Sequence, residues 1–132
     1  VVSYGSTLRL VEEAAEELTA FGVSLEVIDV QTLLPFDLDH LCAKSLQKTN
    51  KLLIVDEDVP GGASAFILKN ILEDQKGYYL LDGKPQTLAA KAHRAPYGSD
   101  GDYFSKPSVD DIIEAAYAMM NEGNPDRYPK LY

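Results

Sequence analysis

The sequence has little of several features that mark specialised classes of protein. Its 132 residues include one cysteine, Cys42, and no tryptophan. A single cysteine cannot build an intramolecular disulfide framework, which excludes a small secreted scaffold held together by disulfides. Uninterrupted apolar runs such as residues 52–55 are far shorter than the roughly 20 residues that a membrane-spanning helix needs. We therefore expect no membrane anchor.

Positive charge is also scarce. The chain has 12 Lys and Arg against 21 Asp and Glu, which gives a formal net charge of -9. Such a charge repels phosphate backbones and anionic lipid surfaces, so we expect neither nucleic acid nor membrane as a partner. The hydrophobic share of 45% and the charged share of 25% are ordinary for a globular protein of one compact domain.

An initiator methionine is missing too, and Val1 and Val2 already have the character of a strand interior. We therefore expect a piece of a longer polypeptide, without a complete active site.

Apolar stretches alternate with helical patterns along the chain. Strands are expected at residues 1–5, 23–30 and 51–56, with a weaker one at 87–92. Helices are expected from Ser6 or Thr7 to Gly22, after Asp37, over 63–76 and after Ser108. The near-continuous apolarity of residues 23–30 is typical of a parallel strand that is covered on both faces.

Local patterns also predict helix caps and buried faces. Asp37 can cap a helix whose core face carries Leu38, Leu41, Cys42, Ser45 and Leu46. Ser108 with Asp111 predicts a capping box for the last helix. Together these patterns indicate an α/β fold, a three-layer αβα sandwich over residues 1–120, followed by an irregular tail over 121–132.

The residues alone predict no catalytic constellation. Tyr4-Gly5-Ser6-Thr7 before a helix could hold a phosphate, as in the flavodoxins, but Leu8, Arg9 and Leu10 depart from the flavodoxin pattern. An N-cap with a tight turn is the simpler interpretation of this loop. Neither histidine has a partner at metal-ligand spacing. Cys42 lies on the apolar face of its helix, so we expect a core residue and no nucleophile.

One segment resembles a known family. Residues 26–37 read E-V-I-D-V-Q-T-L-L-P-F-D, similar to the transketolase C-terminal domain family, whose 2-oxoacid dehydrogenase branch typically reads E-V-I-D-L-R-T-L-x-P-x-D. Further similarities follow in the right order up to about residue 116, including the acidic end of the strand at residues 52–57, a Gly-Gly turn and the segment 107–112. The motif residues, for which we expect structural roles, are Asp29, Thr32, Leu33, Pro35, Asp37, Glu57, Gly61 and Gly62.

The resemblance implies the C-terminal part of the beta subunit, or of a fused alpha–beta chain, of a thiamine-diphosphate-dependent 2-oxoacid dehydrogenase. In that family other domains hold the thiamine diphosphate, its Mg²⁺ and the catalytic residues. It therefore implies no catalytic, cofactor or metal residue in this chain, and no activity of the isolated domain. It also implies a mostly parallel sheet in which the Val1 strand lies antiparallel at an edge.

The family's partners follow from the same resemblance. They are the remaining domains or subunits of a homo- or hetero-oligomer and the lipoyl acyltransferase core, in the cytoplasm or, in a eukaryote, the mitochondrial matrix. Gln31 in place of the usual Arg and the longer tail depart from the pattern. Aromatic and basic residues in the late loop and tail are candidates for the interface, namely His93, Arg94, Tyr97, Phe104, Tyr128 and Tyr132.

Two alternatives stay open at this stage. One is a flavodoxin-like carrier of FMN. The other is the C-terminal domain of another thiamine-diphosphate enzyme, such as transketolase or deoxyxylulose-phosphate synthase.

Overall fold

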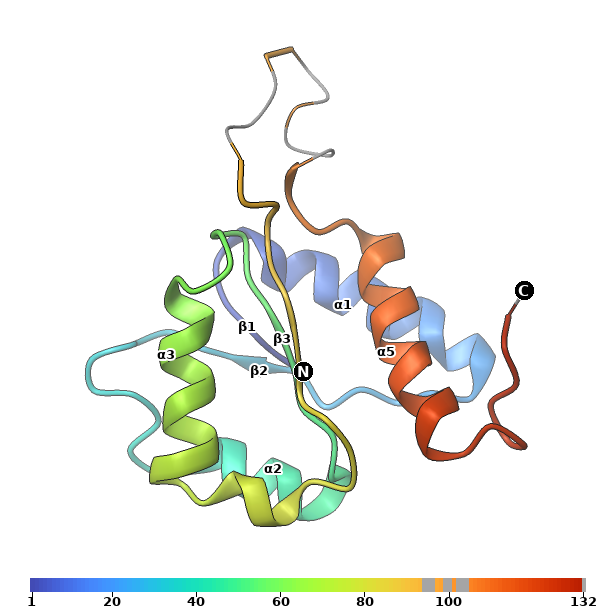
Figure 1. Ribbon diagram of the computed structural model, residues 1–132, viewed down its shortest axis with the longest axis horizontal. Helices are drawn as coiled ribbons and strands as arrows, with labels where there is room; N and C mark the ends of the chain where they lie inside the picture. Colours follow the sequence, from blue (N-terminus) through green and yellow to red (C-terminus); the bar gives the residue numbers. More distant parts are fainter. Residues whose placement is uncertain (94–96, 99–100, 102–104, 132) are drawn as a thin grey trace.

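The computed structural model describes residues 1–93, 97–98, 101 and 105–131. Its centre is a four-stranded sheet in the order β2-β1-β3-β4 (Figure 1). The strands are short: β1 (Val2–Ser3), β2 (Ile28–Asp29), β3 (Leu53–Val55) and β4 (Gln86–Leu88). The main helices are α1 (Ser6–Leu18), α2 (Leu41–Thr49), α3 (Ala63–Lys69) and α5 (Val109–Gly123).

The helices cover both faces of the sheet. Strand β3 shows how, because its side chains alternate between two cores: Leu53 and Val55 pack with α1 and α5, whereas Ile54 packs with α2 and α3. All three β3 side chains are buried. The three-layer α/β architecture predicted from the sequence is confirmed.

The predicted antiparallel edge strand is wrong. Strand β1 lies inside the sheet, where Val2 pairs in parallel with Ile28 on one side and Ile54 on the other. All strand pairs in the described part of the chain are parallel. Val2 and Ser3 are both buried, which an interior position with helices on both faces explains. The edges are β2 and β4.

The strand predicted over residues 23–30 is much shorter than expected. Only Ile28–Asp29 pair with the sheet, at its edge, where Ile28 is half-buried and Asp29 is exposed. The preceding residues Leu25 and Val27 are partly buried against the core beneath α1 and α5. Their apolar character therefore reflects packing beside the sheet and not a long strand inside it.

Helix α2 begins later than predicted. Its N-cap is His40, in the left-handed conformation with φ of 54°, and its first residue is Leu41. Cys42, Ser45 and Leu46 are buried, as expected. Leu38 and Leu41 are exposed, so their predicted place in the core was wrong.

The other helices keep the predicted positions with adjusted faces and ends. Helix α1 begins at Ser6, with Gly5 as its N-cap and no side-chain cap, and it buries Thr7, Val11, Ala14 and Leu18. Helix α3 continues into a π-turn, Asn70–Asp74, and a 3₁₀ turn follows at Gly77–Leu80. Helix α5 runs on to Gly123, three residues past the expected end of the domain.

The predicted capping box of α5 is confirmed. The Ser108 hydroxyl accepts the N–H of Asp111 at 3.2 Å, and the Asp111 carboxylate accepts the N–H of Ser108 at 2.9 Å. We expect Ser108→Ala to lower the free energy of unfolding by about 1 kcal/mol, because one N-terminal donor loses its acceptor. Urea titration followed by circular dichroism measures this, with Ser24→Ala, at an exposed position, as the control. Equal effects of the two substitutions would contradict the assigned cap.

Candidate functional site

The carboxyl ends of β1 and β3 are the first place to look for a site. The chain leaves β1 toward β2 on one side of the sheet and reaches β3 on the other side, which makes this the topological switch point. Ligands of open α/β folds bind at such a point. Here the residues after β1 include Tyr4 and Ser6, and those after β3 include Asp56 and Glu57.

Asp56 is fully buried at this switch point. Its carboxylate accepts the Tyr4 hydroxyl at 2.6 Å and the N–H groups of Asp58 and Ser64, each at 2.9 Å. Burial and the neighbouring Asp56 raise the pKa of the Tyr4 hydroxyl well above its ordinary 10.0. Asp56 thereby joins the end of β1, the end of β3 and the first turn of α3.

The hydroxyls of the loop after β1 are also used within the protein. Ser6 donates to the carboxylate of Glu57, and Thr7 donates to the carbonyl of Tyr4 at 2.8 Å. Lys106 lies 3.6 Å from the same Glu57 carboxylate. A loop whose hydroxyls are paired and whose neighbours are acidic is not suited to a phosphate. The arrangement fits a tight turn better than a flavodoxin-like FMN site, but the predicted side-chain N-cap is wrong, because Gly5 occupies the N-cap and no side chain caps α1.

The predicted capping role of Asp37 is confirmed, but the geometry of the cap is unexpected. It lies four residues before Leu41, and its carboxylate accepts the N–H groups of Leu41 and Cys42, each at 2.9 Å. Gln75 donates to the same carboxylate at 2.9 Å and accepts the N–H of Ala43 at 3.1 Å. The side chain of Gln75 thus ties the segment over residues 31–40 and the start of α2 to the end of the π-turn.

These contacts predict a pH-dependent contribution of Asp37 to stability. Burial opposes ionisation of its carboxyl, but the hydrogen bonds from Cys42, Gln75 and Leu41 outweigh it and lower the pKa below its ordinary 3.8. A lowered pKa in the folded state stabilises the fold above about pH 4, and this contribution is lost as the pH falls further. We expect Asp37→Ala to lower the free energy of unfolding by about 2 kcal/mol at pH 7.

Urea titrations at pH 7 and pH 3 test this prediction of pH dependence. The difference between Asp37→Ala and the unsubstituted chain should shrink at pH 3. Asp39→Ala, which removes the same charge at an exposed position, is the matched control. A difference that stays the same at both pH values would contradict the role of the ionised carboxylate.

The other motif residues lie at the end of β2, in the segment after it or in the turn before α3. Asp29 accepts the side-chain N–H of Gln31 at 3.0 Å, Thr32 is exposed, and Leu33 packs partly against the core under α2 and α3. Pro35 follows a cis peptide bond. Gly61 adopts φ of 89°, which favours glycine, and at Gly62 a Cβ atom would overlap the Asp58 carboxylate. In this structure these residues have structural roles. That they form the motif of a family stays a prediction for each of them.

Cys42 and the histidines form no reactive cluster. Cys42 is buried, and burial together with the nearby Asp37 raises the pKa of its thiol to about 12, so it is unsuited to act as a nucleophile. His40 and His93 are both exposed. In the described residues no group of three or more His, Cys, Asp or Glu could hold a metal ion. None of the described helices is long and apolar enough to cross a bilayer.

The interface residues predicted from the late loop and tail have different surroundings. Tyr97 is 84% exposed and His93 is exposed, as a contact with a partner requires. Tyr128 is 7% exposed and packs against the ring of Tyr117 at a centroid distance of 6.3 Å, so it offers little surface to a partner. Arg94, Phe104 and Tyr132 lie outside the described residues.

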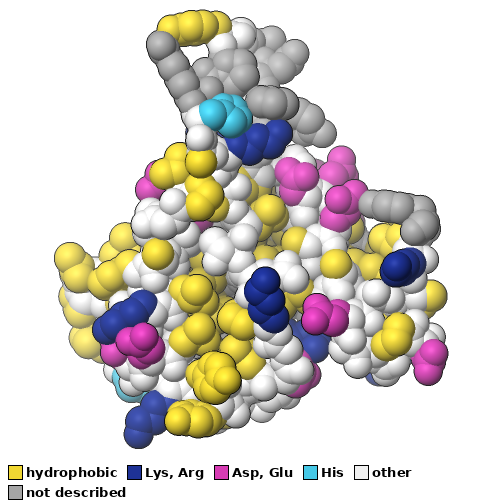
Figure 2. All heavy atoms as spheres, in the orientation of Figure 1, with side chains coloured by type: hydrophobic (Ala, Val, Ile, Leu, Met, Phe, Trp, Pro, Cys, Tyr) yellow, Lys and Arg dark blue, Asp and Glu magenta, His cyan; other side chains and the backbone are white. Residues whose placement is uncertain are grey.

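An exposed apolar surface was missed by the sequence analysis. Leu34 is 80% exposed, Leu38 75%, Leu41 54% and Phe66 39%. We call these four residues the apolar rim. Phe36, in the same segment as the leucines, contacts the ring of Phe66 on α3 at a centroid distance of 6.3 Å. Figure 2 shows hydrophobic side chains gathered at the side of the molecule formed by residues 31–40 and α3.

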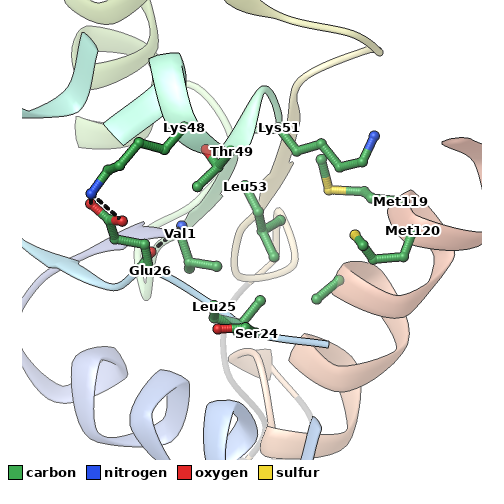
Figure 3. Close-up of a pocket in the computed structure, with 11 residues that line it drawn as sticks. Val1, Ser24, Leu25, Glu26, Lys48, Thr49, Lys51, Leu53, Met119 and Met120 are labelled. Carbon is green, nitrogen blue, oxygen red and sulfur yellow. Dashed lines mark hydrogen bonds and ion pairs between the residues drawn. The ribbon is translucent and has the colours of Figure 1, made fainter. Parts of the chain in front are cut away.

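A cavity of about 340 Å³ lies near the amino-terminal ends of β1 and β3, at the other end of these strands from the switch point (Figure 3). Its apolar lining comes from the two strand ends Val1 and Leu53, from Leu25 and from Met119 and Met120 of α5. At its rim Lys48 and Glu26 form an ion pair at 2.7 Å. The cavity brings together no nucleophile and base, so it offers no catalytic chemistry of its own.

Comparisons with known proteins agree with this arrangement. The family described as "Transketolase, C-terminal domain" matches residues 1–112. The pyruvate dehydrogenase E1 component subunit beta of Rhizobium meliloti is 30% identical, over 90% of this chain and 25% of its own length. The subunit of the same name from Mesostigma viride is 33% identical, over 91% of this chain and 36% of its own.

Two further similarities extend the picture. The beta subunit of the acetoin:2,6-dichlorophenolindophenol oxidoreductase of Bacillus subtilis is 30% identical, over 89% of this chain and 34% of its own length. A solved structure titled "Split gene transketolase, inactive beta4 tetramer" superposes with a TM-score of 0.65 at 19% identity, over 89% of this chain and 37% of that one. The chain therefore spans about a quarter to a third of the length of these relatives.

Proposed function

The chain belongs to the transketolase C-terminal domain family, and on this premise we propose that it is the assembly and partner-docking domain of the decarboxylating component of a 2-oxoacid dehydrogenase. The whole protein would remove CO₂ from a 2-oxoacid and pass the remaining acyl group to a lipoyl group. The acyl carbon is oxidised in that step, and the lipoyl disulfide is reduced.

The observation that carries the proposal is the apolar rim. Four large apolar side chains from residues 31–41 and α3 are exposed in the isolated chain. Monomeric proteins rarely leave such side chains gathered on one surface, and apolar patches of this kind mark contacts with other proteins. A domain that covers the rim with another part of the enzyme would gain the free energy of burying these side chains.

The described residues do not fit the cofactor of the proposed enzyme. Mg²⁺ needs several oxygen ligands, and the described part of the chain contains no acidic cluster that could supply them. Asp56, the buried acid at the switch point, already accepts hydrogen bonds from three donors within the chain. We therefore assign thiamine diphosphate and Mg²⁺ to the remaining domains or subunits of the whole protein.

The similarity to E1 beta subunits also suggests the partners of the whole protein and its cellular compartment. They would be the other domains or subunits of an oligomeric enzyme and a lipoyl acyltransferase core. The exposed Tyr97 and His93, with Arg94, Phe104 and Tyr132, remain candidates for contacts with them. The compartment would be the cytoplasm of a bacterium or the matrix of a mitochondrion.

Calorimetry tests whether the cofactor is bound by the rest of the enzyme and not by this chain. We expect titration of thiamine diphosphate with Mg²⁺ into the 132-residue chain to give no saturable heat. The whole protein should bind the cofactor under the same conditions. Tight stoichiometric binding to the 132-residue chain alone would contradict the proposal.

A further inference from the structure

After α5 the chain turns back and lies beside that helix (Figure 1). We call residues 125–131 the strap. The side-chain amide of Asn121 donates to the carbonyl of Tyr128 at 2.7 Å. One helical turn earlier, the Tyr117 hydroxyl donates to the carbonyl of Pro129, also at 2.7 Å. Since every peptide carries such carbonyls, α5 holds the strap as a protein holds a peptide by its main chain.

One side chain anchors the strap. Among the strap residues, all of which the structure describes, only Tyr128 is buried. Its ring meets the edge of Tyr117, which in turn meets Phe21, at centroid distances of 6.3 and 6.0 Å. The guanidinium of Arg127 lies 5.3 Å from the centre of the Tyr128 ring. The strap thus fills an aromatic slot with a single residue.

The charges of the strap and of α5 are complementary. Helix α5 carries four acidic residues and no Lys or Arg, whereas the strap carries Arg127 and Lys130 beside one acid, Asp126. Lys130 and Glu114 line the same cavity of about 230 Å³, where the end of the strap meets α5. In a chain of net charge -9, two bases so close together favour docking on an acidic helix.

The contacts of the strap are few for the freedom that it loses. Ordering each of its residues costs conformational entropy, and the return is one buried ring and two hydrogen bonds from α5. The cavity beside Lys130 and Leu131 shows that the end of the strap does not fill the surface of α5. Detaching the strap therefore costs less free energy than unfolding the domain.

We propose that α5 is a reversible docking site for the strap, which opens and closes over the aromatic slot of Tyr117 and Phe21 while the sheet stays folded. The closed strap keeps other proteins from this face of the molecule. The site goes beyond the assembly role and does not depend on it, because it shares no residue with the apolar rim.

Hydrogen exchange tests whether the strap opens by itself. The N–H of Tyr128 donates to the carbonyl of Asn124, and the N–H of the buried Asp56 donates to the carbonyl of Leu88, each at 2.9 Å. Corrected for intrinsic rates, the Tyr128 amide should exchange roughly 100-fold faster or more, without dependence on low urea concentrations. Equal protection of the two amides, with the same dependence on urea, would overturn the proposal.

A substitution on α5 shows whether this exchange reports docking. Asn121→Ala removes one bond to the strap and should speed exchange of the Tyr128 amide roughly fivefold. Asn70→Ala is the matched control, because it removes a side-chain amide that donates to the carbonyl of Phe66 on α3. It should leave the Tyr128 rate unchanged. A rate that is the same in both variants would contradict docking on α5.

A synthetic peptide of residues 124–131 tests the site directly, by nuclear magnetic resonance titration of the Tyr128→Ala chain, whose own strap lacks its anchor. We expect saturable shifts at Tyr117 and Asn121. The unsubstituted chain should bind the peptide roughly tenfold more weakly or less, because its strap competes. Tyr79→Ala, which removes an 83% exposed tyrosine, should behave like the unsubstituted chain. A peptide with Ala in place of its tyrosine should lose at least about tenfold in affinity.

Two results of the titration would overturn the proposal. One is a Tyr128→Ala chain that keeps its circular dichroism spectrum and does not bind the peptide. The other is equal binding by the Tyr128→Ala and Tyr79→Ala chains. If Tyr128→Ala does not fold, the exchange rates of the unsubstituted chain and of Asn121→Ala still decide the question.

Discussion

Replacing Asp56 by Ala is expected to lower the free energy of unfolding by about 3 kcal/mol, a large share of the stability of a domain of this size. The substitution leaves three donors without their acceptor: the Tyr4 hydroxyl and the N–H groups of Asp58 and Ser64. The three donors belong to the loop after β1, the loop after β3 and the first turn of α3. Loss of the carboxylate therefore loosens β1, β3 and α3 from one another at once.

Tyr4→Phe isolates one of these three bonds and should cost about 1 kcal/mol. In a double-mutant cycle with Asp56→Ala the two losses should not add, because Tyr4 has no carboxylate to bond once Asp56 is gone. Urea unfolding followed by circular dichroism gives the values, with Asp126→Ala, at an exposed site in the tail, as the charge control. A loss below 1 kcal/mol for Asp56→Ala would show that the buried network contributes little.

The Asp56 network shows where prediction from the sequence stops. The acid at the end of an apolar strand was visible, and so was a helix start after Gly62. What the sequence did not reveal is that the acid is buried and that its partner Tyr4 lies 52 residues earlier in the chain. Contacts of that separation depend on which strands become neighbours, and local patterns carry no information on that order.

Features fixed by neighbouring residues were predicted well. The Ser108–Asp111 capping box forms through contacts three residues apart, and the four apolar residues 52–55 allow little besides a buried strand. The position of β1 required more than local patterns. Its two paired residues are both buried, including polar Ser3, whose hydroxyl donates to the carbonyl of Val55 at 2.9 Å.

The error at Leu38 and Leu41 has a physical cause that bears on function. Leu38, Leu41 and the truly buried Leu46 fit one helical spacing, so all were predicted to face the core. Asp37 caps α2 from outside, with φ of 41°, and the backbone turns through His40 before the helix begins. This turn places Leu38 and Leu41 on the surface, so their helical spacing from Leu46 does not predict that they are buried. The apolar residues of a core and those of an interface look alike in a single sequence.

The leucines of the apolar rim give the second large prediction. We expect the double substitution Leu38→Asp with Leu41→Asp in the whole protein to weaken its assembly with partner domains or subunits by roughly 100-fold or more. Burial of a leucine side chain contributes about 1.5–3 kcal/mol, and two such losses account for at least this factor. Burying the new carboxylates at the interface would add a further cost.

The fold itself should tolerate these changes. Both side chains are more than half exposed, so neither substitution removes a buried core contact. The melting temperature of the 132-residue chain should therefore change by only a few degrees, while sedimentation of the whole protein shifts to smaller species. Leu131→Asp introduces the same group at another exposed site, in the tail, and should leave assembly intact. If the double variant assembles like the unsubstituted protein, the apolar rim is not the docking surface, and the exposed Tyr97 becomes the next site to test.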